Sequence, residues 1–407
     1  MALWKKGFIV LLLVMSTSVM AKKDSQYLLS EKTYKALSAA QELMAADKNA
    51  QAEKKLKVLL QRVKSGSYEE AVVLQTLGYL YSGQEAYQKA AKYFQKALAL
   101  KALPKKVNQD LQYNLAQLYL ADAQYKKGIA LMEQWLKQVA SPPNQVHILL
   151  ASAYYRTKSY KNAIKHIRLA IKHDKQPKEA WYQLLLSSYL QLKYYKSAIQ
   201  VLETLITRYP YQKTYWSQLS ALYLQQNKEF RALAVKMLAE RLNLNDNKTI
   251  LSLAEMYRYL HIPYKAGILL DKAISTGKIT ASYDNLSKLA DSWLAAQEKE
   301  KAATVLKKLV KIDKTGEATL KLGRLFFSME RWKPTIAALQ EGLPKLKQDK
   351  QGEARLLLGM AYYHLGHYQQ AKIQFDKALA YQQERQQAGQ WLHHLQTIME
   401  PKNVEQS

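Results

Sequence analysis

Apolar and polar residues follow one another along this chain with the spacing of amphipathic helices, and the stretch from Ala354 to Tyr381 shows the pattern most clearly. Its apolar and small residues recur three and four positions apart, which places them on one face of each of two predicted helices. These residues are Leu358, Gly359 and Tyr362 in the first helix and Tyr368, Ala371, Phe375 and Ala378 in the second. Leu365-Gly366-His367 supplies the break between them. A pair of helices of this size cannot bury its own apolar stripe, so the pattern predicts further helix pairs of the same kind packed beside it.

The same pattern occurs about ten times, at intervals of 33 to 38 residues. The position equivalent to Gly359 serves as a marker, and it is small or apolar in every copy. The markers are Ala40, Gly78, Ala116, Ala151, Leu186, Ser220, Ala254, Ala290, Gly323 and Gly359. An aromatic residue stands three positions after nine of the markers, and a large apolar residue stands sixteen positions after most of them. Several residue types that recur jointly at fixed offsets indicate a repeat architecture.

This pattern resembles the tetratricopeptide repeat, whose unit has about 34 residues with small, aromatic and large apolar residues at these offsets. The resemblance implies an all-α fold, a right-handed α-solenoid of about ten helix-turn-helix units over residues 22–383. In that family the first helices line a concave side and the second helices a convex side. Some copies depart from the pattern, and after Ser220 the second helix near Phe230 to Leu242 fits only with a one-residue slip. Residues 384–399 are predicted to form a C-terminal capping helix, and residues 400–407 a short polar tail.

The first 21 residues have the order of a secretory signal peptide. Lys5 and Lys6 precede an apolar run from Phe8 to Met15, and small residues lead to Ala21. This order predicts cleavage after Ala21 and a location in the periplasm. The apolar run is short for a bilayer span, and an uncleaved anchor stays open as the alternative.

The chain has 61 Lys and Arg against 33 Asp and Glu among its 407 residues, a formal net charge of +28, and no cysteine. The lack of cysteine excludes disulfides, thiol chemistry and lipid attachment of the lipoprotein type. The charge suits a nucleic acid, an anionic membrane surface or an acidic protein. Because an exported protein meets little nucleic acid, we expect anionic envelope material or an acidic protein face instead.

The charge is most one-sided from Ser141 to Glu240, where 15 Lys and Arg face 5 Asp and Glu. Basic residues recur there at helical spacings and predict a basic ridge. The ridge residues are Lys158, Lys161, Lys165, Arg168 and Lys172. Two interpretations stay open: a solvated convex face, or a docking surface for an acidic partner or anionic lipid.

No HExxH, GxSxG, Walker-type or GxGxxG motif is present in the sequence. Eight histidines are scattered along it, and pairs such as His166 with His173 or His364 with His367 lack a third ligand. We therefore interpret the histidines as ordinary surface side chains. No metal, no cofactor and no enzymatic activity are expected.

Most of the 29 tyrosines are explained by packing, and many of these stand three or nine positions after a marker. The aromatic, Arg and Gln residues that the repeat does not require are predicted to face the concave groove. They are Tyr79, Tyr113, Gln117, Tyr155, Arg156, Gln183, Gln218, Arg258, Tyr259, Arg324, Phe327, Tyr363 and His364. Aromatic residues with Arg are typical of binding hot spots. The carboxylate clamp of chaperone-binding repeats is not expected, because Asn114 lacks its partner residues.

Three segments carry a closer resemblance. They are SEKTYKALSAAQELMAADKNAQAEKKL (Ser30 to Leu56), YPYQKTYWSQLSALYL (Tyr209 to Leu224) and LAEMYRYLHIPYKAGILLDKAISTGKI (Leu253 to Ile279). They are similar to periplasmic tetratricopeptide proteins encoded beside TonB energy-transduction systems in marine gamma-proteobacteria. The resemblance implies a non-enzymatic scaffold that assists TonB-dependent transport through the outer membrane.

Two functional hypotheses result. The first is a periplasmic scaffold that binds a protein or peptide, such as a segment of a TonB-complex component, in the groove. The second is an envelope assembly factor that binds peptidoglycan or lipopolysaccharide through the basic ridge. An enzyme is the weakest of the three classes considered.

Overall fold

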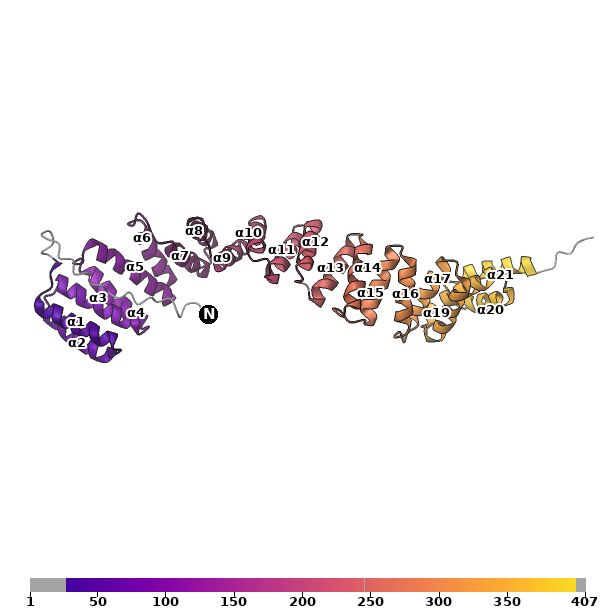
Figure 1. Cartoon of the computed structure of the whole chain (residues 1–407), viewed down its shortest axis with the longest axis horizontal. Coiled ribbons are helices and arrows are strands. Elements are labelled where there is room, and N and C mark those ends of the chain that lie inside the picture. Colours follow the sequence, from indigo (N-terminus) through magenta and orange to yellow (C-terminus); the bar gives the residue numbers. More distant parts are fainter. Residues whose placement is uncertain (1–26, 245, 400–407) are drawn as a thin grey trace, which may run out of the picture. The chain divides into compact units, whose positions relative to one another are not determined.

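The computed structural model describes residues 27–244 and 246–399 (Figure 1). In this part every regular element is helical, with 21 α-helices and the short 3-10 helix η2 (Leu343–Lys345). The predicted signal peptide, residues 1–21, and the predicted polar tail, residues 400–407, lie outside the described residues. None of the described helices combines the length and the apolar composition that crossing a membrane requires.

The chain divides into two compact units, Met1–Leu205 and Ile206–Ser407. The helices of the first unit are α1 (Glu31–Ala45), α2 (Asn49–Arg62), α3 (Tyr68–Gly83), α4 (Tyr87–Ala99), α5 (Lys105–Ala121), α6 (Tyr125–Leu136), α7 (Asn144–Arg156), α8 (Tyr160–His173), α9 (Glu179–Gln191) and α10 (Tyr195–Arg208), within which the division falls. The odd-numbered helices up to α19 are called first helices below, and the even-numbered ones second helices.

The second unit continues the series of helix pairs. Its helices are α11 (Lys213–Gln225), α12 (Glu229–Arg241), α13 (Asn247–Tyr259), α14 (Pro263–Ser275), α15 (Tyr283–Ala295), α16 (Lys299–Val310), α17 (Glu317–Ser328), α18 (Trp332–Gly342), α19 (Gln348–His364), α20 (Tyr368–Ala378) and α21 (Arg385–Met399). In both units a second helix packs against the first helix before it and against the next first helix, as α4 does with α3 and α5 and α16 does with α15 and α17. Consecutive packed pairs confirm the all-α repeat fold predicted from the sequence.

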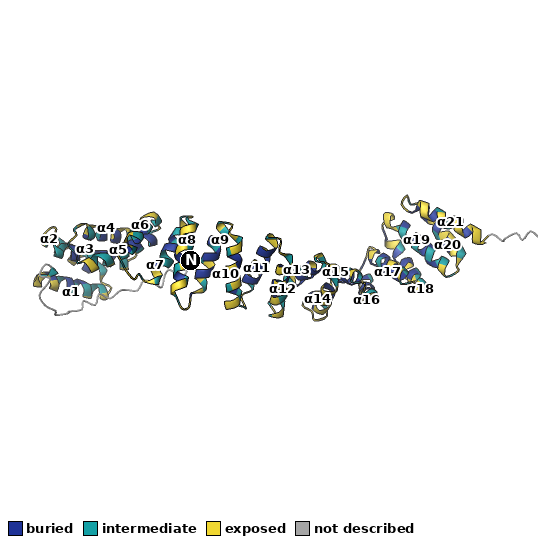
Figure 2. Ribbon diagram, turned by 90° about the horizontal axis from the view of Figure 1, so that it is seen from above, coloured by how far each residue is buried: buried dark blue, intermediate teal, exposed yellow. Residues whose placement is uncertain are grey.

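The marker is buried in all ten repeats. A Cβ atom on Gly78 would lie 2.2 Å from the ring of Phe94, the large residue sixteen positions later. On Gly359 it would lie 2.4 Å from the ring of Phe375, again sixteen positions later. Both rings are buried, and Figure 2 shows buried and exposed residues on different sides of the helices. At these two crossings the absence of a side chain on the marker therefore allows the two helices to approach closely.

The turn within each pair has the same backbone conformation in every repeat. The residue seven positions after the marker has a positive φ, between 52 and 75°. These residues are Asp47, Glu85, Ala123, Lys158, Lys193, Asn227, His261, Gln297, Glu330 and Gly366. Glycine adopts this left-handed conformation without strain, yet only one of the ten residues is glycine. The packing of the two helices therefore fixes the turn against the preference of the local residue.

The one-residue slip predicted for the second helix of the Ser220 repeat is wrong, as the small-residue position of that helix shows. Ala232 on α12, twelve positions after Ser220, is fully buried, so the helix keeps the common register there. The departure comes four positions later, where Lys236 stands in place of a large apolar residue. Its Nζ donates a hydrogen bond to Ser252 Oγ on α13 at 2.7 Å, and burial lowers the pKa of Lys236. The helix accommodates a polar residue in register and does not shift.

Helix α21 occupies the residues predicted for the C-terminal cap. Trp391 stacks on Phe375 of α20, with ring centroids 5.6 Å apart, and Leu395 is 1% exposed. Ala388 is buried in the same cluster. The helix thus covers the apolar stripe that α19 and α20 would otherwise expose.

Candidate partner-binding surfaces

All thirteen predicted groove residues lie on first helices, as their repeat positions predict. Six of the side chains are exposed and seven are half-buried. The exposed ones are Arg156, Gln183, Gln218, Tyr259, Arg324 and His364, and the half-buried ones are Tyr79, Tyr113, Gln117, Tyr155, Arg258, Phe327 and Tyr363. Residues up to Gln183 belong to the first unit and the others to the second.

In the first unit the aromatic members of the set are held by neighbours. The ring of Tyr79 packs edge-on against Phe94, and its hydroxyl accepts a hydrogen bond from Asn114 Nδ2 at 3.0 Å. Tyr113 stacks on Trp135 of α6 with a centroid distance of 4.8 Å, and burial raises its pKa. Contacts of this kind hold both rings in place on their helices.

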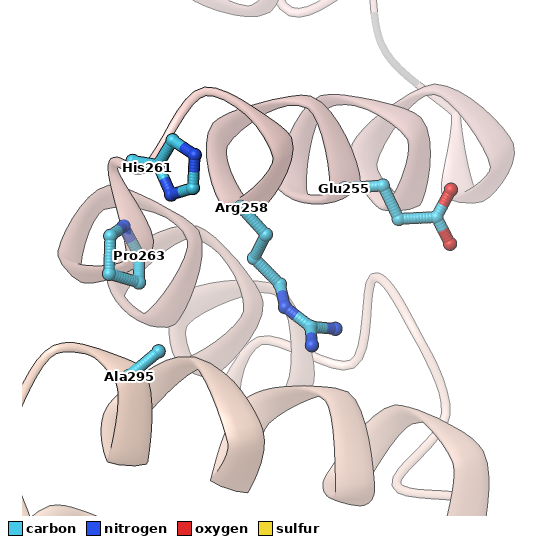
Figure 3. A pocket seen from close by; sticks show the side chains of 5 residues that line it. All are labelled: Glu255, Arg258, His261, Pro263 and Ala295. Atoms are coloured by element: carbon cyan, nitrogen blue, oxygen red, sulfur yellow. The ribbon is translucent and has the colours of Figure 1, made fainter.

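In the second unit Arg258 contributes to an open pocket of about 480 Å³. Glu255, Arg258, His261, Pro263 and Ala295 line it, from α13, the turn after it, α14 and α15 (Figure 3). Figure 3 shows the Arg258 side chain extending from α13 toward α15. The neighbouring residue, Tyr259, is 71% exposed. An arginine, a carboxylate and an imidazole therefore line one small pocket, and an exposed aromatic residue follows Arg258 in the sequence.

A series of ion pairs joins successive first helices of the second unit. Lys288 Nζ on α15 lies 2.8 Å from Glu255 Oε1 on α13, and Lys321 Nζ on α17 lies 3.1 Å from Asp291 Oδ1 on α15. In each pair the carboxylate follows its marker by one position, and the lysine precedes the next marker by two. The same arrangement therefore recurs in consecutive repeats.

Arg324 is part of the same series, although it was predicted as a groove residue. Its Nε and Nη2 both donate to the carboxylate of Glu353 on α19. This two-point contact fixes the guanidinium and neutralises its charge. Arg324 therefore links α17 to α19 and offers a partner less charge than its exposed position suggests.

The structure brings Phe327, Tyr363 and His364 into one aromatic cluster with residues of α18 and α21. His364 stacks on Trp332 with ring centroids 4.1 Å apart and an angle of 8°. The hydroxyl of Tyr363 lies 2.9 Å from His394 Nε2. Because α21 packs on Tyr363, that side chain is half-buried, whereas the neighbouring His364 remains exposed.

Four of the five basic-ridge residues form a row on α8. Lys161, Lys165, Arg168 and Lys172 are all exposed, at intervals of four, three and four residues. Lys158 is also exposed but lies in the turn before the helix, with a φ of 60°. The ridge on the helix therefore has four members, with Lys158 at its end.

The interpretation of the histidines as surface side chains is wrong for His166, which is 3% exposed. Its Nε2 lies 3.0 Å from Glu133 Oε1 on α6, and its Nδ1 lies 3.1 Å from His147 Nδ1 on α7. Burial lowers the pKa of both imidazoles, and the proximity of His166 lowers that of His147 further. Burial, together with a hydrogen bond to Glu133, raises the pKa of Tyr154 to about 12.

The His166 cluster does not have the geometry of a metal site. Glu133 and His147 contact opposite nitrogens of the His166 ring, so the three side chains do not converge on one point. Within residues 27–244 and 246–399, no group of three or more His, Asp or Glu side chains could hold a metal ion. The cluster instead satisfies buried polar groups where α6, α7 and α8 meet.

Sequence reasoning missed the ion-pair series, although a signal for it exists. Tyr79, Gln117 and Arg324 were selected one position after their markers, and Glu255 and Asp291 occupy that same position. The position two before the next marker holds Lys288 and Lys321, whose charge is opposite to that of Glu255 and Asp291. A comparison of these two positions would have predicted the ion pairs. Trp332 stands nine positions after its marker, where the pattern often has an aromatic residue, whereas for His394 the repeat pattern gives no signal.

The repeats of this chain match models of a known family. A tetratricopeptide-repeat model matches residues 113–180, and a second such model matches residues 71–102, 179–212 and 352–385. These segments are tetratricopeptide repeats. The remaining pairs share their marker, turn and packing, as described above.

Several solved structures have similar folds. The structure described as "YrrB: a TPR protein with an unusual peptide-binding site" has a TM-score of 0.37 and 16% identity, over 47% of this chain and 96% of that one. The MamA protein has a TM-score of 0.36 and 20% identity, over 43% and 94% of the two chains. The APC/C hetero-tetramer Cut9-Hcn1 has a TM-score of 0.30 and 14% identity, over 89% and 84%. No curated protein matches the chain.

Proposed function

We propose that this protein is a non-enzymatic scaffold that binds a protein or peptide partner through its first helices. The observation that carries the proposal is the pocket at Arg258, next to the exposed ring of Tyr259. Arginine and tyrosine are the residue types that contribute most to binding energy at protein interfaces. Glu255 is paired with Lys288, so the Arg258 guanidinium is the cation in the pocket available to a partner.

The partner is an extended or helical segment. A pocket of about 480 Å³ accommodates one or two side chains, which is a small part of a folded protein surface. A segment laid across successive first helices would place its next side chains against α15 or α11. Such recognition of consecutive side chains is how repeat surfaces bind peptides.

We further propose that the protein acts in the periplasm, where its partner is a TonB-complex component or another envelope protein. The predicted signal peptide supports the location. The resemblance of Tyr209 to Leu224 and of Leu253 to Ile279 to TonB-associated proteins supports the transport role. Four of the five residues that line the Arg258 pocket lie in the second of these segments.

A photo-crosslinking amino acid placed at position 259, in the envelope of the source organism, tests the proposal. We expect capture of a defined protein, which mass spectrometry identifies. The matched control is position 230, because Phe230 is 68% exposed on α12, a second helix of the same unit. Equal capture of the same proteins from both positions would refute recognition by the first helices.

Recovery of the captured protein then tests the two residues. We expect Arg258→Ala with Tyr259→Ala to reduce recovery at least about tenfold, the effect of losing a hot spot. Phe230→Ala should leave recovery unchanged. Turnover of a substrate by the purified protein would contradict the non-enzymatic part of the proposal.

The second hypothesis, an envelope assembly factor that binds peptidoglycan or lipopolysaccharide, depends on the basic ridge. The exposure of all its side chains favours it. Charge reversal at Lys161, Lys165 and Arg168 should abolish such binding, which should also weaken steeply as the salt concentration rises. Binding at the Arg258 pocket should survive the same reversal.

A further inference from the structure

Four second helices of the first unit, α2, α4, α6 and α8, carry thirteen Lys and Arg residues and two carboxylates. All thirteen basic side chains are exposed. They are Lys54, Lys55, Lys57 and Arg62 on α2, Lys89, Lys92 and Lys96 on α4, Lys126 and Lys127 on α6, and Lys161, Lys165, Arg168 and Lys172 on α8. The basic ridge of α8 is thus one part of a larger surface.

The two carboxylates on these helices are already engaged. Glu53 pairs with Lys57 and accepts a hydrogen bond from the hydroxyl of Tyr81, and Glu133 contacts His166 and Tyr154. Among the described residues, the twelve other basic side chains on these helices form no ion pair. Three lysines lie over tyrosine rings, at 5.4 to 5.9 Å, and are still exposed.

The exposed sides of these helices belong to one face of the unit. Each helix packs between two first helices: α2 between α1 and α3, and so on to α8 between α7 and α9. Its exposed side therefore points away from the first helices. The first helices α1, α3, α5 and α7 carry five basic and five acidic residues, so the excess of positive charge in these helix pairs lies on the second helices.

We propose that this face, called the second-helix face, binds the anionic surface of a phospholipid bilayer. Each Lys or Arg near such a surface contributes about 1 kcal/mol of attraction, and the contributions need no defined geometry. A binding site for lipid headgroups goes beyond the scaffold function, because it uses the opposite side of the repeats and does not depend on the Arg258 pocket.

The residue types favour a lipid surface over a protein or a nucleic acid. Eleven of the thirteen basic residues are lysine, which is depleted at protein interfaces where arginine is enriched. Nucleic-acid sites combine arginine with exposed aromatic rings on which bases stack. The one large apolar side chain exposed on these four described helices is Val58. A lysine surface without apolar anchors matches adsorption at the headgroup level.

The test compares two variants with the same net charge in the full chain. The face variant carries Lys92→Glu, Lys126→Glu, Lys161→Glu and Lys165→Glu. The control variant carries Lys265→Glu, Lys308→Glu, Lys333→Glu and Lys372→Glu, at exposed residues on second helices of the second unit. Both have the same first 26 residues, so binding through that segment is common to both. Helical circular dichroism and the melting temperature establish that each variant is folded.

Sedimentation with vesicles measures the affinity. We expect the wild type to bind vesicles of phosphatidylcholine with about 30 mol % phosphatidylglycerol, and to bind pure phosphatidylcholine weakly. The face variant should bind the anionic vesicles at least about tenfold more weakly, and the control variant within about threefold of the wild type. Raising the salt concentration from about 50 to about 500 mM should release the wild type.

Three results would overturn the proposal. One is no binding of the wild type to anionic vesicles at low salt. Another is an equal loss in both variants, which would mean that net charge alone governs binding. The third is retention by peptidoglycan sacculi without binding to vesicles, which would favour the envelope-factor hypothesis.

Discussion

In the first unit the hydroxyl of Tyr79 on α3 accepts a hydrogen bond from Asn114 on α5. In the second unit the same two repeat positions hold Glu255 and Lys288, which form an ion pair, and a second such pair follows one repeat later. Neighbouring first helices are thus joined by a neutral hydrogen bond in one unit and by ion pairs in the other.

The second helices differ in the same way. In the first unit, α2, α4, α6 and α8 carry thirteen basic residues against two acidic ones, and in the second unit α12, α14, α16, α18 and α20 carry twelve against six. The buried markers and the turns are nevertheless the same in both. The repeat thus constrains the buried positions and leaves the surface free to diverge, so the two units can bind different partners.

The largest expected effect comes from disrupting the helix packing at the marker position, which the two units share. Gly78→Leu should destabilise the first unit by about 3 kcal/mol, because its side chain would overlap the buried ring of Phe94. Gly359→Leu should do the same in the second unit at Phe375. Hydrogen exchange of α3 and α4, or of α19 and α20, measures the loss.

Each of these variants has a matched control with open space around the glycine. At Gly83, also on α3, and at Gly389, on α21, an added Cβ would have no atom within 4 Å apart from its chain neighbours and the adjacent backbone of its own helix. Gly83→Leu and Gly389→Leu should both leave hydrogen exchange within experimental error. If Gly78→Leu behaves like Gly83→Leu, close approach at the marker is not what holds the pair together.

The second prediction concerns pH and the first unit. Folding buries His166 against His147 and lowers the pKa of both below the ordinary value of about 6.5. The unfolded chain binds protons at that ordinary value, so the stabilisation is fully present above about pH 6.5 and is lost as the pH falls below it. Urea unfolding of the first unit, followed by hydrogen exchange at about pH 7.5 and about pH 5.5, should show this loss.

Substituting both histidines tests the assignment. His147→Gln with His166→Gln should flatten the pH dependence in this range, whatever its effect on stability at neutral pH. His393→Gln, at an exposed histidine on α21 in the second unit, should keep the wild-type dependence. An unchanged slope in the double variant would assign the pH effect to other groups.

The sequence is sufficient to predict the fold, because the markers and the residues sixteen positions later meet within one pair. Gly78 with Phe94 is an example of such a local contact. The burial of His166 could not be predicted, since its partners Glu133 and His147 come from the preceding repeat and the facing helix. The slip assigned after Ser220 arose because Lys236 occupies a position where the pattern requires an apolar side chain.

The sequence predicts the helices that carry the candidate site residues, but not the contacts that these residues make. Repeat positions place a residue on a first helix, which is where all thirteen predicted residues lie. They do not say whether a neighbouring repeat supplies a partner. Arg324 is neutralised by Glu353, and Tyr363 lies under α21, whereas Tyr259 has no such cover.

A third, smaller effect separates the two kinds of link between first helices. Lys321→Gln should cost about 0.5 kcal/mol at low salt and almost nothing at high salt, because its half-exposed pair with Asp291 is screened. Asn114→Ala should cost about 1 kcal/mol at any salt concentration, because it removes a neutral hydrogen bond. Thermal unfolding at two salt concentrations measures both. Equal salt dependence in the two variants would contradict the distinction between the units.

The smallest expected effect is a gain of stability at the turns, and it should be the same in both units. Ala123 and Gln297 have φ values of 58 and 60°, a conformation that glycine adopts without strain. Ala123→Gly in the first unit and Gln297→Gly in the second should each stabilise the protein by about 0.5 kcal/mol, the relief of strain minus the greater flexibility of glycine in the unfolded chain. Gly366→Ala should have the opposite sign, because it introduces the strain at the one turn that lacks it. The melting temperature of each of the three variants measures the effect. A lower melting temperature for Gln297→Gly would contradict the prediction, because it would mean that the Gln297 side chain stabilises the turn by more than the positive φ costs.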